Sequence, residues 1–156
     1  MPYYRKGSLA DEIKNITTQT GIISFLYQIT MAFLAFDKHA GCWHLDLKPD
    51  NILVKAEGEY LICDFGCAKL VDSLNVSRLP ITHVRGAGTT RYAAPEVIMD
   101  FVGGKYSDVW SLGVILYEIL YDGDHPLMNI SKNYPDTIGK FLEGLVKINF
   151  PPKPGF

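Results

Sequence analysis

The chain has 156 residues, of which 47% are hydrophobic and 21% are charged, and its formal net charge is −2. This composition excludes a disordered chain and suits one domain with a sizeable core, and the small charge gives no electrostatic basis for binding nucleic acid. The three cysteines lack the spacing of metal ligands, so we expect free thiols in a reducing compartment.

The two segments that bear on targeting both point away from a membrane. The N-terminal residues are polar and charged, so no signal peptide is expected. The longest apolar stretch, Ile22–Phe36, is interrupted by polar residues and is too short to cross a bilayer. We therefore expect a cytoplasmic or nuclear protein without a membrane partner.

Two helices are predicted near the N-terminus. Ser8 can cap a short helix, with Asp11 and Glu12 near its positive end. A longer helix is predicted over Thr20–His39, because apolar residues recur there at helical spacing and form a wide buried face. These apolar residues are Ile22, Ile23, Leu26, Ile29, Ala32, Phe33 and Phe36.

The middle of the chain predicts a loop, a hairpin and a long irregular segment. Pro49 stops helix continuation in the loop over Gly41–Asn51. Two short apolar runs, Ile52–Val54 and Tyr60–Cys63, flank a polar turn at residues 57–59 and predict a small β-hairpin. Residues 67–93 show no strong period, and a segment of that length is usually functional or disordered.

The C-terminal part predicts a helix that is buried on most sides. Tyr106–Tyr121 is strongly apolar around the helix, and Ser107 or Asp108 lies at its start. A second helix is plausible over Asp136–Lys147, followed by an extended tail. The chain as a whole predicts a single α+β domain that is mainly α-helical.

Four polar side chains form a candidate phosphoryl-transfer site. Such a reaction needs metal ions on the phosphates, positive charge near the moving group and an acceptor for the proton of the nucleophile. Asp46 can accept a hydroxyl hydrogen bond, and Lys48 can neutralise phosphate charge in the same space. Asn51 and Asp64 offer hard oxygen ligands, which suit Mg²⁺. This ordered set, with a hairpin between its halves, favours phosphoryl transfer.

Four motifs carry a resemblance to a known family. They are HLDLKPDN at residues 44–51, DFG at 64–66, Ala94-Pro95-Glu96, and YSDVWSLGVILYE from Tyr106. In this order and spacing they resemble the C-terminal lobe of the eukaryotic protein kinases, over nearly the whole chain. The resemblance implies a kinase-like C-terminal lobe with a small β-hairpin and a long activation segment. It also implies ATP and Mg²⁺ as cofactors and a protein as substrate.

The resemblance implies roles for the polar side chains. Asp46 would be the catalytic base, and Lys48 would touch the transferred phosphate. Asn51 and Asp64 would bind Mg²⁺, with Asp64 also serving the nucleotide. Thr89 resembles the threonine that closes the active site in the serine/threonine branch, to which the Lys48-Pro49 pair also points.

Further residues are matched to the nucleotide pocket and to the packing of the lobe. Met1 and Tyr4 would lie in the hinge beside ATP, and Leu53 would form the floor under the adenine. Four other positions carry structural expectations from the same resemblance. Asp108 would bind the catalytic-loop backbone, His44 and Phe65 would stack, and Leu45 replaces an arginine that pairs with an activation-segment phosphate.

Parts of the kinase pattern have no counterpart in these 156 residues. The Gly-rich loop, the strand lysine and its glutamate partner are missing, so we expect residues 1–156 to be a partial kinase domain without the N-terminal lobe and the last helices. Glu96 also lacks the late arginine with which it pairs in the family, so it is expected to be hydrated, protonated or differently paired.

The expected function is that of a protein serine/threonine kinase fragment. In the full-length context it would transfer the ATP γ-phosphate to serine or threonine, whereas the isolated chain is expected to be inactive or very weak, because nucleotide positioning supplies most of the rate. A segment supplying the missing lobe, or a regulatory protein, is a further expected partner. The alternatives are a catalytically inactive, kinase-like interaction module and a decayed gene fragment. Leu45 also predicts a weaker need for activation-segment phosphorylation.

Overall fold

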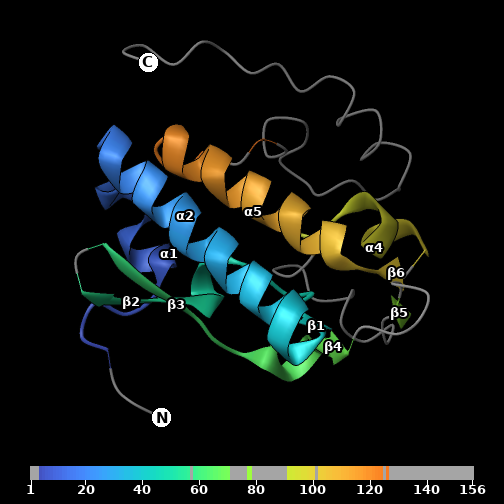
Figure 1. Cartoon of the computed structure of the whole chain (residues 1–156). Helices are drawn as coiled ribbons and strands as arrows, with labels where there is room; N and C mark the ends of the chain where they lie inside the picture. Colours follow the sequence, from blue (N-terminus) through green and yellow to red (C-terminus); the bar gives the residue numbers. More distant parts are fainter. Residues whose placement is uncertain are drawn as a thin grey trace.

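The computed structural model describes residues 4–56, 58–70, 77–78, 91–100, 102–124 and 126. Two long helices, α2 (Gln19–Ala35) and α5 (Lys105–Leu120), lie side by side, and the hairpin strands lie beside α2 (Figure 1). Buried residues of both helices belong to one hydrophobic core, which also takes in Leu47 and Ile52. The described part therefore consists of helices and small sheets, as the sequence predicts.

The first helical element is short and begins where the sequence predicts. Helix α1 covers Leu9–Glu12 and continues as a 3-10 turn, η1, over Ile13–Asn15. The backbone N–H of Ser8 donates to the Asp11 carboxylate at 3.0 Å, which satisfies one of the unpaired donors at the helix start. Leu9 is fully buried, so this turn anchors the chain to the core.

Helix α2 is the long helix predicted over Thr20–His39. The Thr18 hydroxyl oxygen accepts the Gly21 N–H at 3.1 Å and caps the start of the helix. After Ala35 the helix continues as one π-turn, η2, over Phe36–Ala40. It ends at Gly41, whose φ of +54° is easy for a residue without Cβ.

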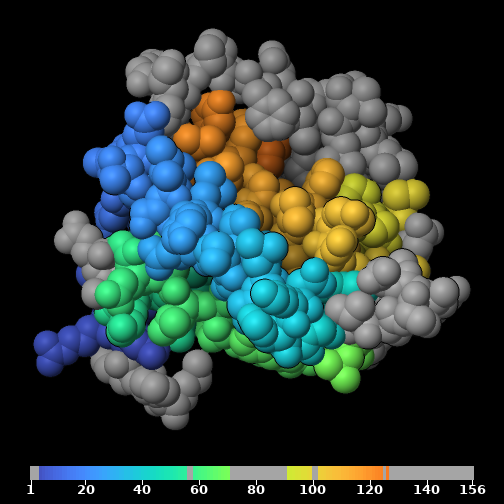
Figure 2. Space-filling model, in the orientation of Figure 1, coloured from blue at the N-terminus to red at the C-terminus, as the bar shows by residue number. Residues whose placement is uncertain are grey.

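Only one face of α2 enters the core. Phe25 and Ile29 are at most 1% exposed, whereas Ile23 on the opposite face is 58% exposed. The prediction that Ile23 belongs to the buried face is therefore wrong, because apolar residues surround this helix and periodicity alone does not say which side is covered. Figure 2 shows the surface of α2 beside that of α5 on one face of the molecule.

The same helical run meets the length and composition of a membrane span. Over Gln19–Ala40 it has 22 residues and a mean hydropathy of 1.3, the one such helix among the described residues. The length argument from Ile22–Phe36 is therefore wrong, because the π-turn extends the helix. Length and composition are weak evidence by themselves, and the core contacts of Phe25 and Ile29 are typical of a helix inside a folded domain.

The predicted hairpin is present. Strand β2 (Ile52–Ala56) pairs antiparallel with β3 (Glu59–Ile62), with a register shift between Val54 and Ala56. Glu59, predicted in the turn, is the first residue of β3. Gln28 of α2 ties the hairpin to the helix, since its amide oxygen accepts the Tyr60 N–H at 3.1 Å.

Two further sheets consist of pairs of two-residue strands. Strand β1 (Cys42–Trp43) pairs with β4 (Lys69–Leu70), and β5 (Ser77–Arg78) pairs with β6 (Val102–Gly103). The prediction of an irregular segment at 67–93 therefore missed β4 and β5. The 3-10 turn η4 (Phe65–Cys67), which ends at the first residue of that segment, was not predicted either. Strands of two residues are too short to show a period. Residues 71–76 and 79–90 lie outside the described residues.

Helix α5 begins one residue before its predicted start and ends one residue before its predicted end. Its N-cap is Gly104, whose N–H donates to the Ser107 hydroxyl oxygen at 3.1 Å. Ile115 is fully buried, but Val109 is 57% exposed, so the helix is open to solvent near its start. A shorter helix, α4 (Pro95–Asp100), precedes it. The predicted helix Asp136–Lys147 and the tail lie outside the described residues.

Candidate active site

The loop between β1 and β2 (the catalytic loop, residues 44–51) brings three of the predicted site residues together. The Lys48 ammonium lies 2.8 Å from Oδ2 of Asp46. The Asn51 amide nitrogen donates to the Asp46 carbonyl oxygen at 2.9 Å and approaches Oδ2 at 3.3 Å. The 3-10 turn η3 (Pro49–Asn51) closes this loop and turns Asn51 back toward Asp46. The Asp46 carboxylate is thus held from two sides.

Lys48 keeps its charge in this loop. Partial burial disfavours the ammonium, but its hydrogen bond with Asp46 and the attraction of Asp46, Asp50 and Asp64 together outweigh that effect, so the pKa of Lys48 is raised. Its side chain is 22% exposed, which leaves the ammonium within reach of a ligand at the surface. A permanent positive charge beside a carboxylate suits the binding of phosphate.

His44 joins the catalytic loop to the strand that leads into DFG. Its ring is fully buried. Nδ1 accepts the Asp46 N–H at 3.3 Å, so Nε2 carries the proton that it shares with the Cys63 carbonyl oxygen at 2.9 Å. Phe65 meets His44 with ring centroids 5.0 Å apart and planes at 61°. The predicted contact is present, but it is edge-on, because the same Phe65 ring also packs against Phe36 at 5.0 Å.

Asp108 holds the catalytic loop from α5. Its two carboxylate oxygens accept the backbone N–H groups of His44 at 2.8 Å and Leu45 at 2.7 Å. The side chain is 4% exposed. Burial raises the pKa of Asp108, although both backbone hydrogen bonds favour the charged carboxylate. This is the contact that the family resemblance implies, and it gives both of these backbone donors an acceptor.

A backbone hydrogen bond of the preceding residue holds Asp64 beside the catalytic loop. The Cys63 N–H donates to the Asn51 carbonyl oxygen at 2.9 Å. Asp64 itself has φ +62° and ψ +73°, a left-handed conformation that costs free energy for a residue with a side chain. Its Oδ1 accepts the Gly66 N–H at 3.3 Å, and the residue is exposed. Backbone strain of this kind is typical of residues held in place for a function.

Leu45 packs in the position where an arginine was expected from the family. It has φ +62° and packs against the buried pair Ala94 and Val97, as Trp110 also does. An apolar side chain there ties the catalytic loop to the start of α4 without a phosphate. The prediction of a weaker need for phosphorylation stays a prediction, since most of residues 67–93 lie outside the described residues.

Glu96 is differently paired, which is one of the three outcomes expected for it. The Ser107 hydroxyl donates to Oε1 of Glu96 at 2.8 Å, and the same hydroxyl oxygen accepts the Gly104 N–H. Glu96 is half-buried. A neutral donor therefore replaces the arginine, so the carboxylate has a partner within the described structure.

A second cluster on α5 was not predicted from the sequence. Glu118, 3% exposed, accepts the Arg91 guanidinium at 2.9 Å and the Tyr92 hydroxyl at 3.0 Å. Ser111 donates to the Tyr92 carbonyl oxygen at 2.8 Å. Burial raises the pKa of both Glu118 and Tyr92. The one signal in the sequence was a single acid in the apolar run of α5 after Asp108. That acid binds Arg91 and Tyr92, which follow Thr89 by two and three residues.

The remaining predicted site residues are only partly located. Tyr4 is half-buried, and its carbonyl oxygen accepts the Gly7 N–H at 3.1 Å. Leu53 lies on β2, paired with Leu61 and bridged to Ser8. Met1 and Thr89 lie outside the described residues.

The cysteines beside DFG give a pH prediction. Burial, followed by the Asp64 charge, raises the pKa of Cys63, and burial with the charges of Asp46 and Asp64 also raises the pKa of Cys67. Because the thiolate is the reactive form, both should react with iodoacetamide at pH 7.5 more slowly than N-acetylcysteine, and the rate should keep rising above about pH 8.5. Mass spectrometry of timed samples measures each site. A Cys63 rate above that of the free thiol at pH 7.5 would contradict the prediction.

Comparison with known proteins adds family evidence to this geometry. The family described as protein kinase domain matches residues 1–152. The chain is 37% identical to the leucine-rich repeat receptor-like protein kinase PEPR1 of Arabidopsis thaliana over 126 residues, which is 76% of this chain and 11% of that protein.

Two yeast proteins show a similar likeness. The chain is 33% identical to the serine/threonine-protein kinase STE20 of Saccharomyces cerevisiae and 34% identical to the serine/threonine-protein kinase shk1/pak1 of Schizosaccharomyces pombe. Each match covers 83% of this chain, and 13% and 19% of the respective relative. The chain thus spans about a tenth to a fifth of the length of these curated relatives.

Proposed function

Because the chain belongs to the protein kinase family, we propose that it carries the catalytic-loop half of an active site that transfers the γ-phosphate of ATP to a serine or threonine hydroxyl of a protein. The observation that supports this most is the Asp46 carboxylate, which is held between the Lys48 ammonium and the Asn51 amide. A carboxylate fixed in this way can accept a proton from a hydroxyl nucleophile.

The loop residues divide the work of phosphoryl transfer. Asp46 orients the substrate hydroxyl and accepts its hydrogen bond. Lys48, only 2.8 Å away, places positive charge beside the same point and can stabilise the phosphoryl oxygens as charge spreads over them. His44 and Asp108 act through the backbone, because their hydrogen bonds fix the position of the main chain that leads into Asp46.

The side chains at this site have the chemistry that Mg²⁺ prefers. The Asn51 amide nitrogen is directed at Asp46, which leaves its carbonyl oxygen as the group able to meet a cation. The exposed Asp64 carboxylate supplies a second hard oxygen. Asn51 and Asp64 would thus hold Mg²⁺, which would supply positive charge to neutralise the phosphates of ATP. Leu53, Tyr4 and Met1 are proposed to lie beside the adenine.

The choice of serine or threonine rests on the Lys48-Pro49 pair, on Thr89 and on the relatives. Two of the relatives described above are serine/threonine-protein kinases by name. For the whole protein, the proposed substrate is a protein that presents serine or threonine, and a regulatory protein or a segment supplying the N-terminal lobe is a further proposed partner.

Binding of Mg·ATP to the 156-residue chain tests the site. Ligand that binds only the folded state stabilises it, so the melting temperature should rise with Mg·ATP concentration. Asp64→Asn should abolish most of that rise, whereas Lys69→Gln on strand β4 serves as a control for an unrelated loss of charge and should retain it. No rise with wild-type protein would favour the alternative of a catalytically inactive interaction module or a decayed fragment.

A further inference from the structure

We propose that a pocket behind the catalytic loop binds a small aromatic amine whose head group combines an ammonium with a hydrogen-bond acceptor. The pocket has a volume of about 350 Å³ and lies between the C-terminal half of α2 with η2 and the N-terminal half of α5. This is within the range of about 300–1,000 Å³ that small-molecule sites occupy. It is separate from the Asp46 site, since neither Asp46 nor Lys48 lines it.

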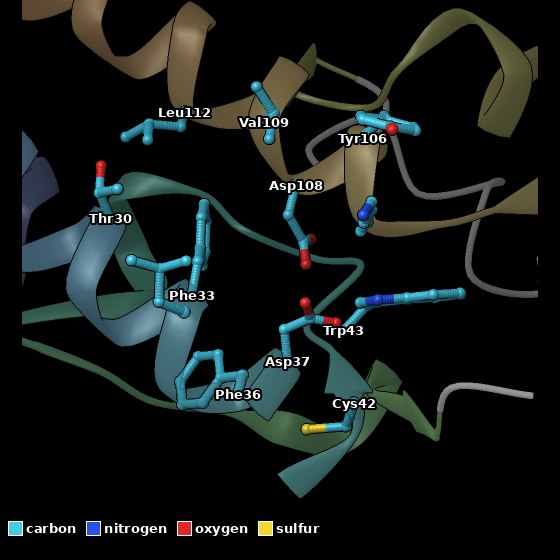
Figure 3. A pocket seen from close by; sticks show the side chains of 12 residues that line it. Thr30, Phe33, Phe36, Asp37, Cys42, Trp43, Tyr106, Asp108, Val109 and Leu112 are labelled. Carbon is cyan, nitrogen blue, oxygen red and sulfur yellow. The ribbon is translucent and has the colours of Figure 1, made fainter. Parts of the chain in front are cut away.

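The walls of the pocket are apolar and aromatic. Phe33 and Phe36 line one side, and Val109 and Leu112 of α5 line the other. Figure 3 shows these side chains around a common space. Such walls favour a flat apolar body, and the rings of Phe33 and Phe36 add edge and face contacts with an aromatic ligand.

One end of the pocket is acidic. Asp37 of η2 and Asp108 of α5 line it together, and Figure 3 shows their carboxylates turned toward each other. Asp108 is already bound to the catalytic-loop backbone, whereas Asp37 is exposed. The lining lysine, Lys105, has its ammonium over the Tyr106 ring at 5.3 Å. An ammonium group on the ligand would therefore meet Asp37 with complementary charge.

The pocket also contains a buried hydrogen-bond donor that lacks an acceptor. Trp43 lines the pocket and is 2% exposed, and its indole Nε1 has no hydrogen-bond partner in the described part of the chain. A buried N–H without a partner costs free energy that an acceptor would recover. Asp37 lines the same pocket. One head group that carries an ammonium and a hydroxyl can therefore satisfy both Asp37 and Trp43.

The pocket is connected to the catalytic loop by two of its own wall residues. Trp43 directly precedes His44, and Asp108 binds the N–H groups of His44 and Leu45. A ligand in the pocket would therefore contact both anchors of the loop that carries Asp46. The inference does not depend on the proposed kinase activity, because binding can be measured without any phosphoryl transfer.

The test uses phenylalaninol as the probe, because it carries a phenyl ring, an ammonium and a hydroxyl. The control compound is 3-phenylpropan-1-ol, which lacks only the ammonium. The indole N–H resonances of the ¹⁵N-labelled 156-residue chain are followed by NMR during titration. The chain has two tryptophans, so Trp110→Phe assigns the Trp43 signal. We expect a saturable shift of the Trp43 indole resonance with phenylalaninol. The affinity for 3-phenylpropan-1-ol should be at least about tenfold lower, a factor that corresponds to 1.4 kcal/mol of binding free energy.

Three variants separate the site from nonspecific binding. Asp37→Asn should weaken phenylalaninol about tenfold, and Asp124→Asn, a matched exposed carboxylate beyond α5, should leave it unchanged. The backbone spectra of both variants report whether they fold as the wild type does. Val109→Trp, which fills the pocket from an exposed position, should also abolish the shift. Absence of a saturable Trp43 shift, equal affinity for the two probes, or equal loss in the Asp124 variant would overturn the proposal.

Discussion

Replacing Asp108 by alanine is expected to lower the free energy of unfolding by about 3 kcal/mol. The change leaves the N–H groups of His44 and Leu45 without acceptors, and each unsatisfied buried donor costs about 1–3 kcal/mol. Asp108 is 4% exposed, so water does not readily replace the lost oxygens. Urea denaturation of the 156-residue chain, followed by far-UV circular dichroism, measures the loss.

Two further variants make this prediction specific. Asp108→Asn keeps one acceptor oxygen and should fall between the wild type and Asp108→Ala. Asp124→Asn removes a charge from an exposed position, where the expected effect is within about 0.5 kcal/mol. If Asp108→Ala changed stability no more than Asp124→Asn, the catalytic loop would not depend on this helix.

Replacing Asp46 by asparagine is expected to lower kcat for peptide phosphorylation by about 10²–10⁴-fold, the usual contribution of a positioned general base. The amide is nearly the same size, but it does not accept a proton at neutral pH, and it loses the charge that Lys48 pairs with. Binding of Mg·ATP should change little, since the proposed Mg²⁺ ligands are Asn51 and Asp64. Phosphate transfer from labelled ATP to a serine-containing peptide measures the rate, in the full-length protein that contains this chain.

The matched control for this prediction is Asp50→Asn in the same loop. Asp50 is exposed and adds to the attraction that holds the Lys48 charge, without a hydrogen bond to it. Its loss should alter kcat by only a small factor. Equal losses in the Asp46 and Asp50 variants would mean that general negative charge matters here and that no single carboxylate acts as the base.

Several local features of this protein follow from its sequence alone. Apolar spacing predicts α5, and the continuous run of α2 with η2, to within one residue at each end, because helix periodicity is a property of neighbouring residues. The β2–β3 hairpin follows from two apolar runs around a glycine turn. The order of Asp46, Lys48, Asn51 and Asp64 indicates phosphoryl transfer, because their chemistry is fixed by residue type.

Other features depended on contacts between distant parts of the chain. Asp108 meets the N–H of a residue 64 positions earlier, and Glu118 meets Arg91 27 positions earlier. The sequence contains both acids, but their partners are set by how α5 packs against the loops. Asp108 was placed by family resemblance, whereas Glu118 had no comparable signal.

The sequence by itself determined which chemical groups this protein carries, in what order, and where the two long helices lie along the chain. Only the tertiary structure decided that Ser107 serves Glu96, that Ile23 faces solvent, and that Asp37 and Trp43 share a pocket with α5. The physical reason is the distance along the chain over which each interaction acts. Helix and turn preferences act over a few residues, whereas burial and hydrogen-bond pairing are settled when whole elements pack, and a helix that is apolar on every side can be covered on any of them.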